Sequence, residues 1–322
     1  MEKKEHQKHK ASHLKTEPVK KSSEKSSGLK DKITNIYDRH YRKMMIIPNI
    51  LLVLSLGILF FNLFTTGQFI EKGVSLSGGV SMTILSPTID NVEVQELLKE
   101  EYSKADVESR TITGGGQQKG IIVEVAGITS EELQSTIVSQ YGLSKEDYTI
   151  EVTGSSLGKS FYKQLIIAIL IAFVLMGTVV YIYYRSIVPS LAIILAAFSN
   201  MITTLAIISL MGVKITPAGI AGFLMLLGFS VDTDILLTTR ALKHKGGTVD
   251  ERMFSALKTG LTMSAAAIAS ISISLIFTHS ETIKQIMTIL LIGLIFDLVY
   301  TWIQNAGIIK MYLEKRGEAK NE

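Results

Sequence analysis

The sequence predicts an α-helical membrane protein with six spans and a smaller α+β domain outside the bilayer. Hydrophobic residues make up 47% of the 322 positions, and apolar stretches of about 20 residues, the length that crosses a bilayer, recur along the chain. Charged residues return in one long segment between the first two of these stretches. The chain contains no cysteine, which excludes disulfides and thiolate metal sites.

The N-terminal segment 1–43 is predicted to be a disordered, basic tail on the cytoplasmic side. It holds 13 Lys and Arg against 6 Asp and Glu and has almost no large apolar residues, so it lacks the apolar surface that folding requires. We favour a solvated tail that sets topology, with contact to ribosomes, anionic lipid or nucleic acid as the alternative. No signal peptide pattern is present, and the apolar stretch 44–66 is the first predicted span.

Residues 67–163 are predicted to form an extracytoplasmic domain of the ferredoxin-like type. Asp90 and Thr129 stand three residues before a glutamate, which is the pattern of a capping box at the start of a helix. Apolar residues in short runs predict four strands, at residues 80–85, 107–113, 121–125 and 148–152. The resulting order, β-α-β-β-α-β, is that of the ferredoxin-like split unit.

Five further spans are predicted within the segment 164–310, before a cytoplasmic tail at 311–322. They cover residues 165–184, 187–211, 217–237, 259–277 and 285–309. Lys and Arg flank the spans mainly on the side of both chain termini, and the positive-inside rule places that side in the cytoplasm. The net acidic 67–163 domain then faces outward from a multi-pass protein of the cell membrane.

Three carboxylates fall inside predicted spans, where each costs about 2.5–3.5 kcal/mol on insertion scales and is rarely accidental. Asp232 and Asp234 lie in the fourth span, about 200° apart around a helix, so they cannot form a side-by-side pair. Asp232 is the deeper and is predicted to be the better candidate for carrying a proton. Asp297 lies near the middle of the sixth span, where burial favours a neutral carboxyl. For all three, the alternative is a hydrogen bond that only fixes helix packing.

Polar side chains on neighbouring spans offer partners for these acids. Lys258, at the start of the fifth span, is either a counter-ion or an ordinary positive-inside anchor. Thr262 belongs to a strip of hydroxyl groups along the same span, which either lines a polar path or aids close helix packing. Asn200 in the third span is placed to form a hydrogen bond between helices.

Other chemistry is not indicated, and the sequence predicts neither an enzyme nor a bound cofactor or metal. The six His residues never fall in a metal-ligand spacing such as H-E-x-x-H. The segment 154–160 ends in Gly-Lys-Ser but lacks the earlier glycine of a phosphate-binding loop. An intramembrane aspartyl protease would require G-x-G-D, whereas Ser-Val precedes Asp232.

Short motifs spread along the chain resemble those of the SecF family, the smaller membrane subunits of the SecD–SecF protein-export complex. Residues 77–79 resemble the motif F-T-G-G, and residues 154–158 resemble V-G-P-S-L-G. Residues 228–234 resemble the fourth-span motif, with a sequence like that of the archaeal branch. The motif positions and one fifth-span residue are expected to serve helix packing: Gly78, Gly79, Gly154, Gly158, Gly228, Ser230, Arg240 and Thr262.

The resemblance implies an accessory role at the Sec translocon, driven by the proton-motive force. It implies a SecD-like subunit, the SecY translocon, exported polypeptides and membrane lipids as partners, no nucleic acid, and a bundle that is half of an RND-type transporter. Bacterial members read Asn-Asp-Thr where this chain has Asp232-Thr233-Asp234, and Arg where it has Lys258. The alternative is a stand-alone, proton-coupled exporter of small molecules.

Overall fold

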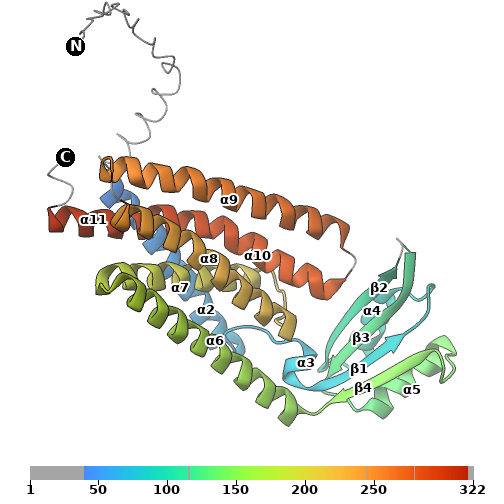
Figure 1. Cartoon of the computed structure of the whole chain (residues 1–322). Helices are drawn as coiled ribbons and strands as arrows, with labels where there is room; N and C mark the ends of the chain where they lie inside the picture. The colour runs from blue at the N-terminus through green and yellow to red at the C-terminus, as the bar shows by residue number, and fades with distance from the viewer. Residues whose placement is uncertain (1–39, 115–116, 245, 279, 318–322) are drawn as a thin grey trace, which may run out of the picture. The chain divides into compact units, whose positions relative to one another are not determined.

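The computed structural model describes residues 40–114, 117–244, 246–278 and 280–317, and this part of the chain confirms six helices long and apolar enough to cross a membrane (Figure 1). Nearly all of the predicted tail 1–43 lies outside the described residues. The membrane helices are α2 (Ile46–Thr66), α6 (Ser155–Tyr184), α7 (Ile187–Leu210), α8 (Pro217–Lys243), α9 (Val249–Phe277), and a last one in three parts, α10 (Glu281–Val299), η1 (Tyr300–Asn305) and α11 (Ala306–Arg316).

Two membrane helices begin about ten residues earlier than their predicted spans. Helix α9 starts at Val249 because Thr248 caps it: its side chain accepts from the Glu251 N–H, and Glu251 reaches back to the Thr248 N–H. Helix α6 starts at Ser155, directly after the last strand of the sheet. The apolar pattern marks only the part of a helix that lies in hydrocarbon, whereas capping groups set where the helix starts.

The last membrane helix contains a π-helical segment that the sequence did not predict. Residues Tyr300–Asn305 form η1, between two α-helical stretches of the same span. Such wide turns are rare and occur frequently at functional sites. The segment begins three residues after Asp297, so it lies beside one of the carboxylates inside the membrane.

The sheet domain between α2 and α6, called the outer domain after its predicted side, confirms the ferredoxin-like prediction. Its strands are β1 (Gly79–Ile84), β2 (Asp106–Gly114), β3 (Gln117–Ala126) and β4 (Tyr148–Thr153), all antiparallel in the order β2-β3-β1-β4. The connecting helices are α4 (Asn91–Glu101) and α5 (Ser130–Tyr141), while a short α3 (Val74–Ser77) precedes β1. Met82 of β1 lies opposite Val123 of β3 and Ile150 of β4 in the sheet register.

The two predicted capping boxes have different outcomes. At α5 both halves form, since Thr129 accepts from the Glu132 N–H and Glu132 accepts from the Thr129 N–H at 2.8 Å. The hydrogen bond from the Thr129 backbone holds the pKa of Glu132 below its ordinary value. At α4 Asp90 accepts from the Val92 N–H, but Glu93 instead accepts from Tyr141 of α5 at 3.3 Å.

The domain's core lies between the sheet and its two helices. Inward residues of β1 and β3 meet one apolar face of each helix, as the helical periodicity predicts. The most deeply buried members are Met82, Ile84, Ile121, Val123, Val125, Val94, Leu98, Leu133 and Ile137, each 0% exposed.

Helix α8 lies at the centre of the bundle, in contact with α7, α9 and α10 (Figure 1). Its outer half packs through small residues: a Cβ at Gly222 would already touch Ile286 and Ile289 of α10. Leu226 of α8 in turn packs so closely on Gly293 of α10 that a Cβ added to this glycine would overlap the leucine side chain. The bundle therefore holds the two acid-bearing helices, α8 and α10, in close contact.

Candidate functional site

Asp297 of α10 is completely buried and is surrounded by hydrogen-bond donors from three helices. Ser230 and Thr233 of α8 both donate to it, the latter to Oδ2 at 2.8 Å. Asn200 of α7 and Thr301 of η1 each lie 3.4 Å from Oδ1. A carboxylate surrounded by several donors is stabilised in its charged form, because these groups replace part of its hydration.

Asp234 of α8 is also 0% exposed but has a much poorer set of partners. Asn305 of η1 donates to its Oδ1 at 2.8 Å, while Oδ2 has no hydrogen-bond partner among the described residues. Asp234 and Asp297 are close enough to interact electrostatically. The pair thus combines one well-solvated carboxyl with one that is poorly solvated.

The π-helical segment supplies polar contacts to both carboxyls and to two more helices. Thr301 and Asn305 reach Asp297 and Asp234. In an uninterrupted α-helix, each step of four residues turns the side chain by about 40°, so Asn305 would be rotated by about 80° from Asp297. The wider turns of η1 reduce this rotation and keep the three side chains on the side that faces α8.

Two further hydrogen bonds connect this segment to α7 and α2. Tyr300 pairs with Thr203 of α7 at 2.6 Å, and Thr203 accepts from Ser55 of α2 at 3.1 Å. Gln304 donates to Asn49 of α2 at 3.2 Å. Sequence reasoning missed these residues and Asn305, although the spacing of Ser230, Asp234 and Thr238 by four shows the polar face of α8 that they meet.

The structure favours Asp234 over Asp232, the reverse of the ranking predicted from depth. Asp232 is exposed on α8, whereas Asp234 and Thr233 are buried against α10 and η1. The predicted separation of Asp232 and Asp234 on opposite faces is therefore present. Depth along a helix says how far a carboxyl lies from water, but the face it occupies decides which groups it meets.

The remaining candidate residues lie away from the carboxyl pair. Lys258 and Thr262 of α9 are exposed, and Thr262 donates to the Lys258 carbonyl of its own helix at 2.9 Å. Arg240 joins α8 to α9 by donating to the Ser255 carbonyl and hydroxyl. Asn200, in contrast, does form the predicted hydrogen bond between helices.

The motif glycines have different surroundings. Gly78 ends α3 at a positive φ of 89°, and a Cβ on Gly79 would overlap the Val125 carbonyl of β3, which makes both positions demand glycine. Gly154 precedes the first residue of α6 and Gly158 lies within that helix. Gly228 of α8 is exposed with open space around it, so close packing within this chain does not explain it.

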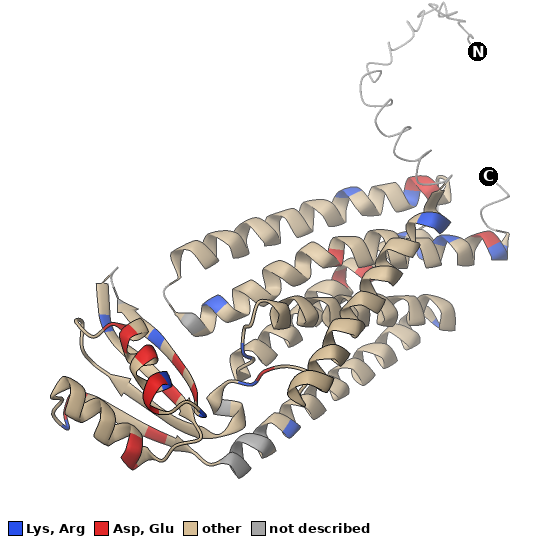
Figure 2. Ribbon diagram, turned by 180° about the vertical axis from the view of Figure 1, so that it is seen from behind, with Lys and Arg blue, Asp and Glu red and all other residues tan. Residues whose placement is uncertain are grey.

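The chemistry that this site can support is the binding and release of a small cation by buried carboxyl groups. Charged residues are sparse along the middle of the bundle helices and more frequent near their ends (Figure 2). Among the described residues, no group of three or more His, Cys, Asp or Glu is arranged to hold a metal ion. Two adjacent buried carboxyls are suited to bind and release a proton or another small cation.

Comparisons with known proteins agree with this arrangement. A family model described as protein export membrane protein SecD/SecF, C-terminal, matches residues 133–315. The protein-export membrane protein SecF of Pyrococcus furiosus is 34% identical over 288 residues, covering 89% of this chain and 96% of that protein. The SecF of Methanolacinia petrolearia is 36% identical over 291 residues, covering 89% and 99%.

Similarity to a solved structure also supports the fold. That structure is the crystal structure of SecDF, a translocon-associated membrane protein from Thermus thermophilus, with a TM-score of 0.65 and 17% sequence identity. The match covers 85% of this chain and 38% of that one, so this chain spans well under half of the larger protein. The family model, the relatives and the six-helix architecture lead to one conclusion: this chain belongs to the SecF family of protein-export membrane proteins.

Proposed function

We propose that this chain is the SecF-type subunit of a protein-export complex and that its buried carboxyl pair binds the ion that drives export. The observation that carries the proposal is the unequal solvation of Asp234 and Asp297, both 0% exposed between α8, α10 and η1. Two like charges close together at low dielectric repel each other strongly. Such a pair favours holding one proton between its two members, and movement of that proton changes the packing of α8 against α10.

The exposed carboxyl Asp232 supports a partner in the membrane. An acid that faces lipid costs about 2.5–3.5 kcal/mol on insertion scales, and a polar group from another subunit removes that cost. The relatives are named SecF and the matching structure is of SecDF, so we propose a SecD-like subunit as this partner. The SecY translocon, exported polypeptides and membrane lipids are the further partners in this proposal.

We propose that both chain termini lie in the cytoplasm and the sheet domain outside the cell membrane. The support is the distribution of Lys and Arg, which are dense at the ends of the helices near the termini. No catalytic role is proposed. The stand-alone exporter of small molecules is not favoured, because the family model and the relatives carry the description of protein export.

The test is export of a secreted reporter in cells that lack this protein, complemented with variants. Asp234→Asn and Asp297→Asn should assemble with the SecD-like partner but lower the export rate at least tenfold. Glu146→Gln, an exposed substitution in the outer domain, is the matched control and should export normally. Wild-type export by both carboxyl variants would show that the two acids only pack helices. Proton uptake by the reconstituted complex, measured with a pH-sensitive dye, then separates protons from other cations.

A further inference from the structure

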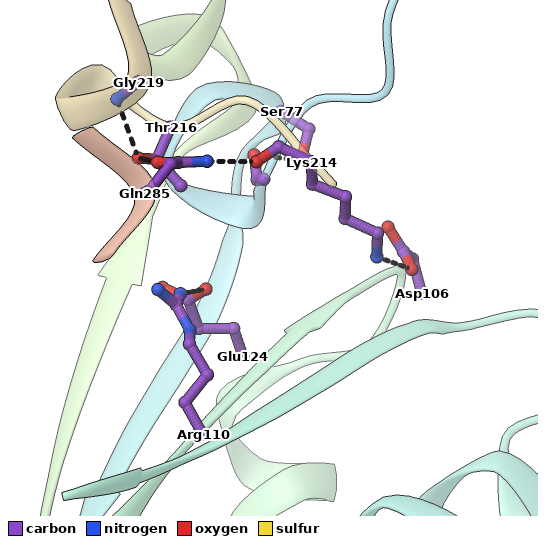
Figure 3. A network of polar contacts seen from close by, with 9 residues as sticks. Ser77, Asp106, Arg110, Glu124, Lys214, Thr216, Gly219 and Gln285 are labelled. Carbon is purple, nitrogen blue, oxygen red and sulfur yellow. Dashed lines mark hydrogen bonds and ion pairs between the residues drawn. The ribbon is translucent and has the colours of Figure 1, made fainter. Parts of the chain in front are cut away.

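The loop between α7 and α8, residues 211–216, lies between the bundle and the outer domain and contacts both (Figure 3). The loop backbone forms hydrogen bonds with residues 71–73, the segment that leads into the sheet. The Ile215 N–H donates to the Glu71 carbonyl at 2.9 Å, and the Gly73 N–H donates to the Ile215 carbonyl at 2.9 Å. These two bonds form a parallel bridge between Lys72 and Ile215, so the loop acts as a short extra strand beside the entry to the domain.

A side-chain contact fastens the same loop to the sheet itself. Lys214 forms an ion pair with Asp106, the first residue of β2. The lysine side chain is 16% exposed and the aspartate 51%, so the pair lies at the edge of the interface. The loop is thereby attached to the outer domain at two places, through its backbone and through one ion pair.

On its other side the loop is held by α10. Gln285 of α10 donates to the Lys214 carbonyl at 2.7 Å and accepts from the Thr216 hydroxyl. Thr216 is also the N-cap of α8, whose first residue, Pro217, follows directly. Figure 3 shows the Gln285 side chain between the two loop residues. One glutamine thus joins α10 to the start of α8 and to the loop.

Both acid-bearing helices therefore run from the carboxyl pair to this loop without a flexible connection. Along α8, Thr216 and Asp234 are separated by about 27 Å of continuous helix at 1.5 Å per residue. Along α10, Gln285 and Asp297 are separated by about 18 Å. A shift of either helix along its axis would therefore displace the loop, because continuous helix and direct hydrogen bonds connect them.

The interface beside the loop is loosely packed. A cavity of about 390 Å³ lies between β2, the loop, and the ends of α9 and α10. Two buried atoms of β2 residues that line it, Glu108 Oε2 and Arg110 Nε, have no hydrogen-bond partner among the described residues. Arg110 is otherwise paired with Glu124 of β3. The direct attachment of the sheet to the bundle here depends on few contacts, which favours an interface that can open.

We propose that the 211–216 loop is the link that carries movement of α8 and α10 to the outer domain, with Lys214 and Gln285 as its positioning residues. The Lys214–Asp106 contact opens and re-forms during each export cycle, while the backbone bridge stays intact. This inference rests on the proposed function in one respect: it takes the ion-dependent motion to begin at the carboxyl pair.

The natural absence of cysteine makes a direct test possible. Lys214→Cys and Asp106→Cys are introduced together, and the assembled complex is treated with a short bifunctional thiosulfonate that a reductant removes. Cross-linking should lower export more than tenfold, and reduction should restore it. The matched control is Thr83→Cys with Thr149→Cys, two residues that face each other across β1 and β4 and lie within one domain. Normal export by the cross-linked 214–106 pair would overturn the proposal.

A second pair of variants keeps the test decisive if the cysteine variant does not assemble. Lys214→Asp and Asp106→Lys should each lower export severalfold through repulsion, and the exchanged pair together should restore it to within about twofold. Full activity of both single variants would also overturn the proposal. Failure of the proposed function is distinguishable, because then Asp234→Asn and Asp297→Asn export normally while the 214–106 cross-link still blocks export.

Discussion

Replacement of Asn305 tests whether the π-helical segment positions the carboxyl pair. The Asn305 amide donates to Oδ1 of Asp234 at 2.8 Å, and Oδ2 of that carboxyl lacks a partner among the described residues. Asn305→Leu keeps the approximate volume and removes the donor. A buried group left unsatisfied costs about 1–3 kcal/mol, so we expect the free energy of unfolding to fall by about that amount.

A double-mutant cycle separates this hydrogen bond from general packing. Asp234→Leu leaves the Asn305 amide unsatisfied and should be similarly costly, whereas the double variant replaces both partners by apolar groups and should recover part of the loss. Cycles between membrane helices give about 0.6 kcal/mol on average and about 1.7 at most. Because this bond involves a carboxyl, we expect a coupling of about 1–1.7 kcal/mol, a factor of roughly 5 to 20 in the folding equilibrium.

The assay is reversible unfolding in bicelles, followed by the fluorescence of Trp302, the chain's one tryptophan and a buried member of the same segment. The control cycle is Asn62→Leu with Ser209→Ala, which removes a hydrogen bond of the same 2.8 Å length between neutral groups of α2 and α7. Its coupling should lie near the average value. Additive effects of Asn305→Leu and Asp234→Leu would refute the positioning role of the segment.

Three further predictions concern the outer domain, the partner face and the bundle core. Burial raises the pKa of Glu108 above its ordinary value, against the lowering effect of Arg110 and Lys214. The stabilisation that protonated Glu108 gives to the closed interface is then fully present below about pH 4.3. It is lost as pH rises through the raised pKa of Glu108. Glu108→Gln should therefore flatten the pH dependence of 214–106 cross-linking, and an unchanged profile would contradict this. Asp232→Leu should leave the free energy of unfolding of the isolated chain unchanged or raise it, yet reduce co-purification with the SecD-like partner. Undiminished co-purification would argue against a partner contact. Gly260→Leu should destabilise α9 against η1 by about 1–3 kcal/mol through overlap with Trp302, which thermal unfolding checks, and no loss would show that the indole relocates freely.

The sequence was most informative where a periodic pattern determines the structure. Continuous apolar runs predict each span, and alternation with capping residues predicts the split β-α-β-β-α-β order that the sheet confirms. The starts of α6 and α9 were predicted too late, since polar turns extend beyond the hydrocarbon region. Glu93 shows a related limit: the local motif predicts a capping box, but the Glu93 carboxylate instead accepts from Tyr141 of another helix.

The carboxyl site was predicted in its residue types and not in its pairing. Asp234 and Asp297 stand out as acids in apolar segments, but their proximity depends on how α8 and α10 are rotated. No periodic pattern marks the π-helical segment, whose Trp302 packs against Gly260 of α9 and whose Asn305 donates to Asp234 of α8. The polar spacing of Ser230, Asp234 and Thr238 was the signal that could have identified the buried face.

The unequal surroundings of the two acids indicate where a change of charge acts on the structure. Asp297 is held by donors from α7, α8 and η1, so a charge there is supported by groups already in place. Asp234 accepts from Asn305 on Oδ1 while its Oδ2 has no partner among the described residues, so we expect a change of its charge to require movement of η1 or entry of water. Since η1 is continuous with α10, and α10 meets the start of α8 again at Gln285, the helix whose η1 part supplies Asn305 to Asp234 also contacts the 211–216 loop. Continuous helix therefore joins the surroundings of the poorly solvated acid to the outer interface, and this is the path that the proposed coupling would use.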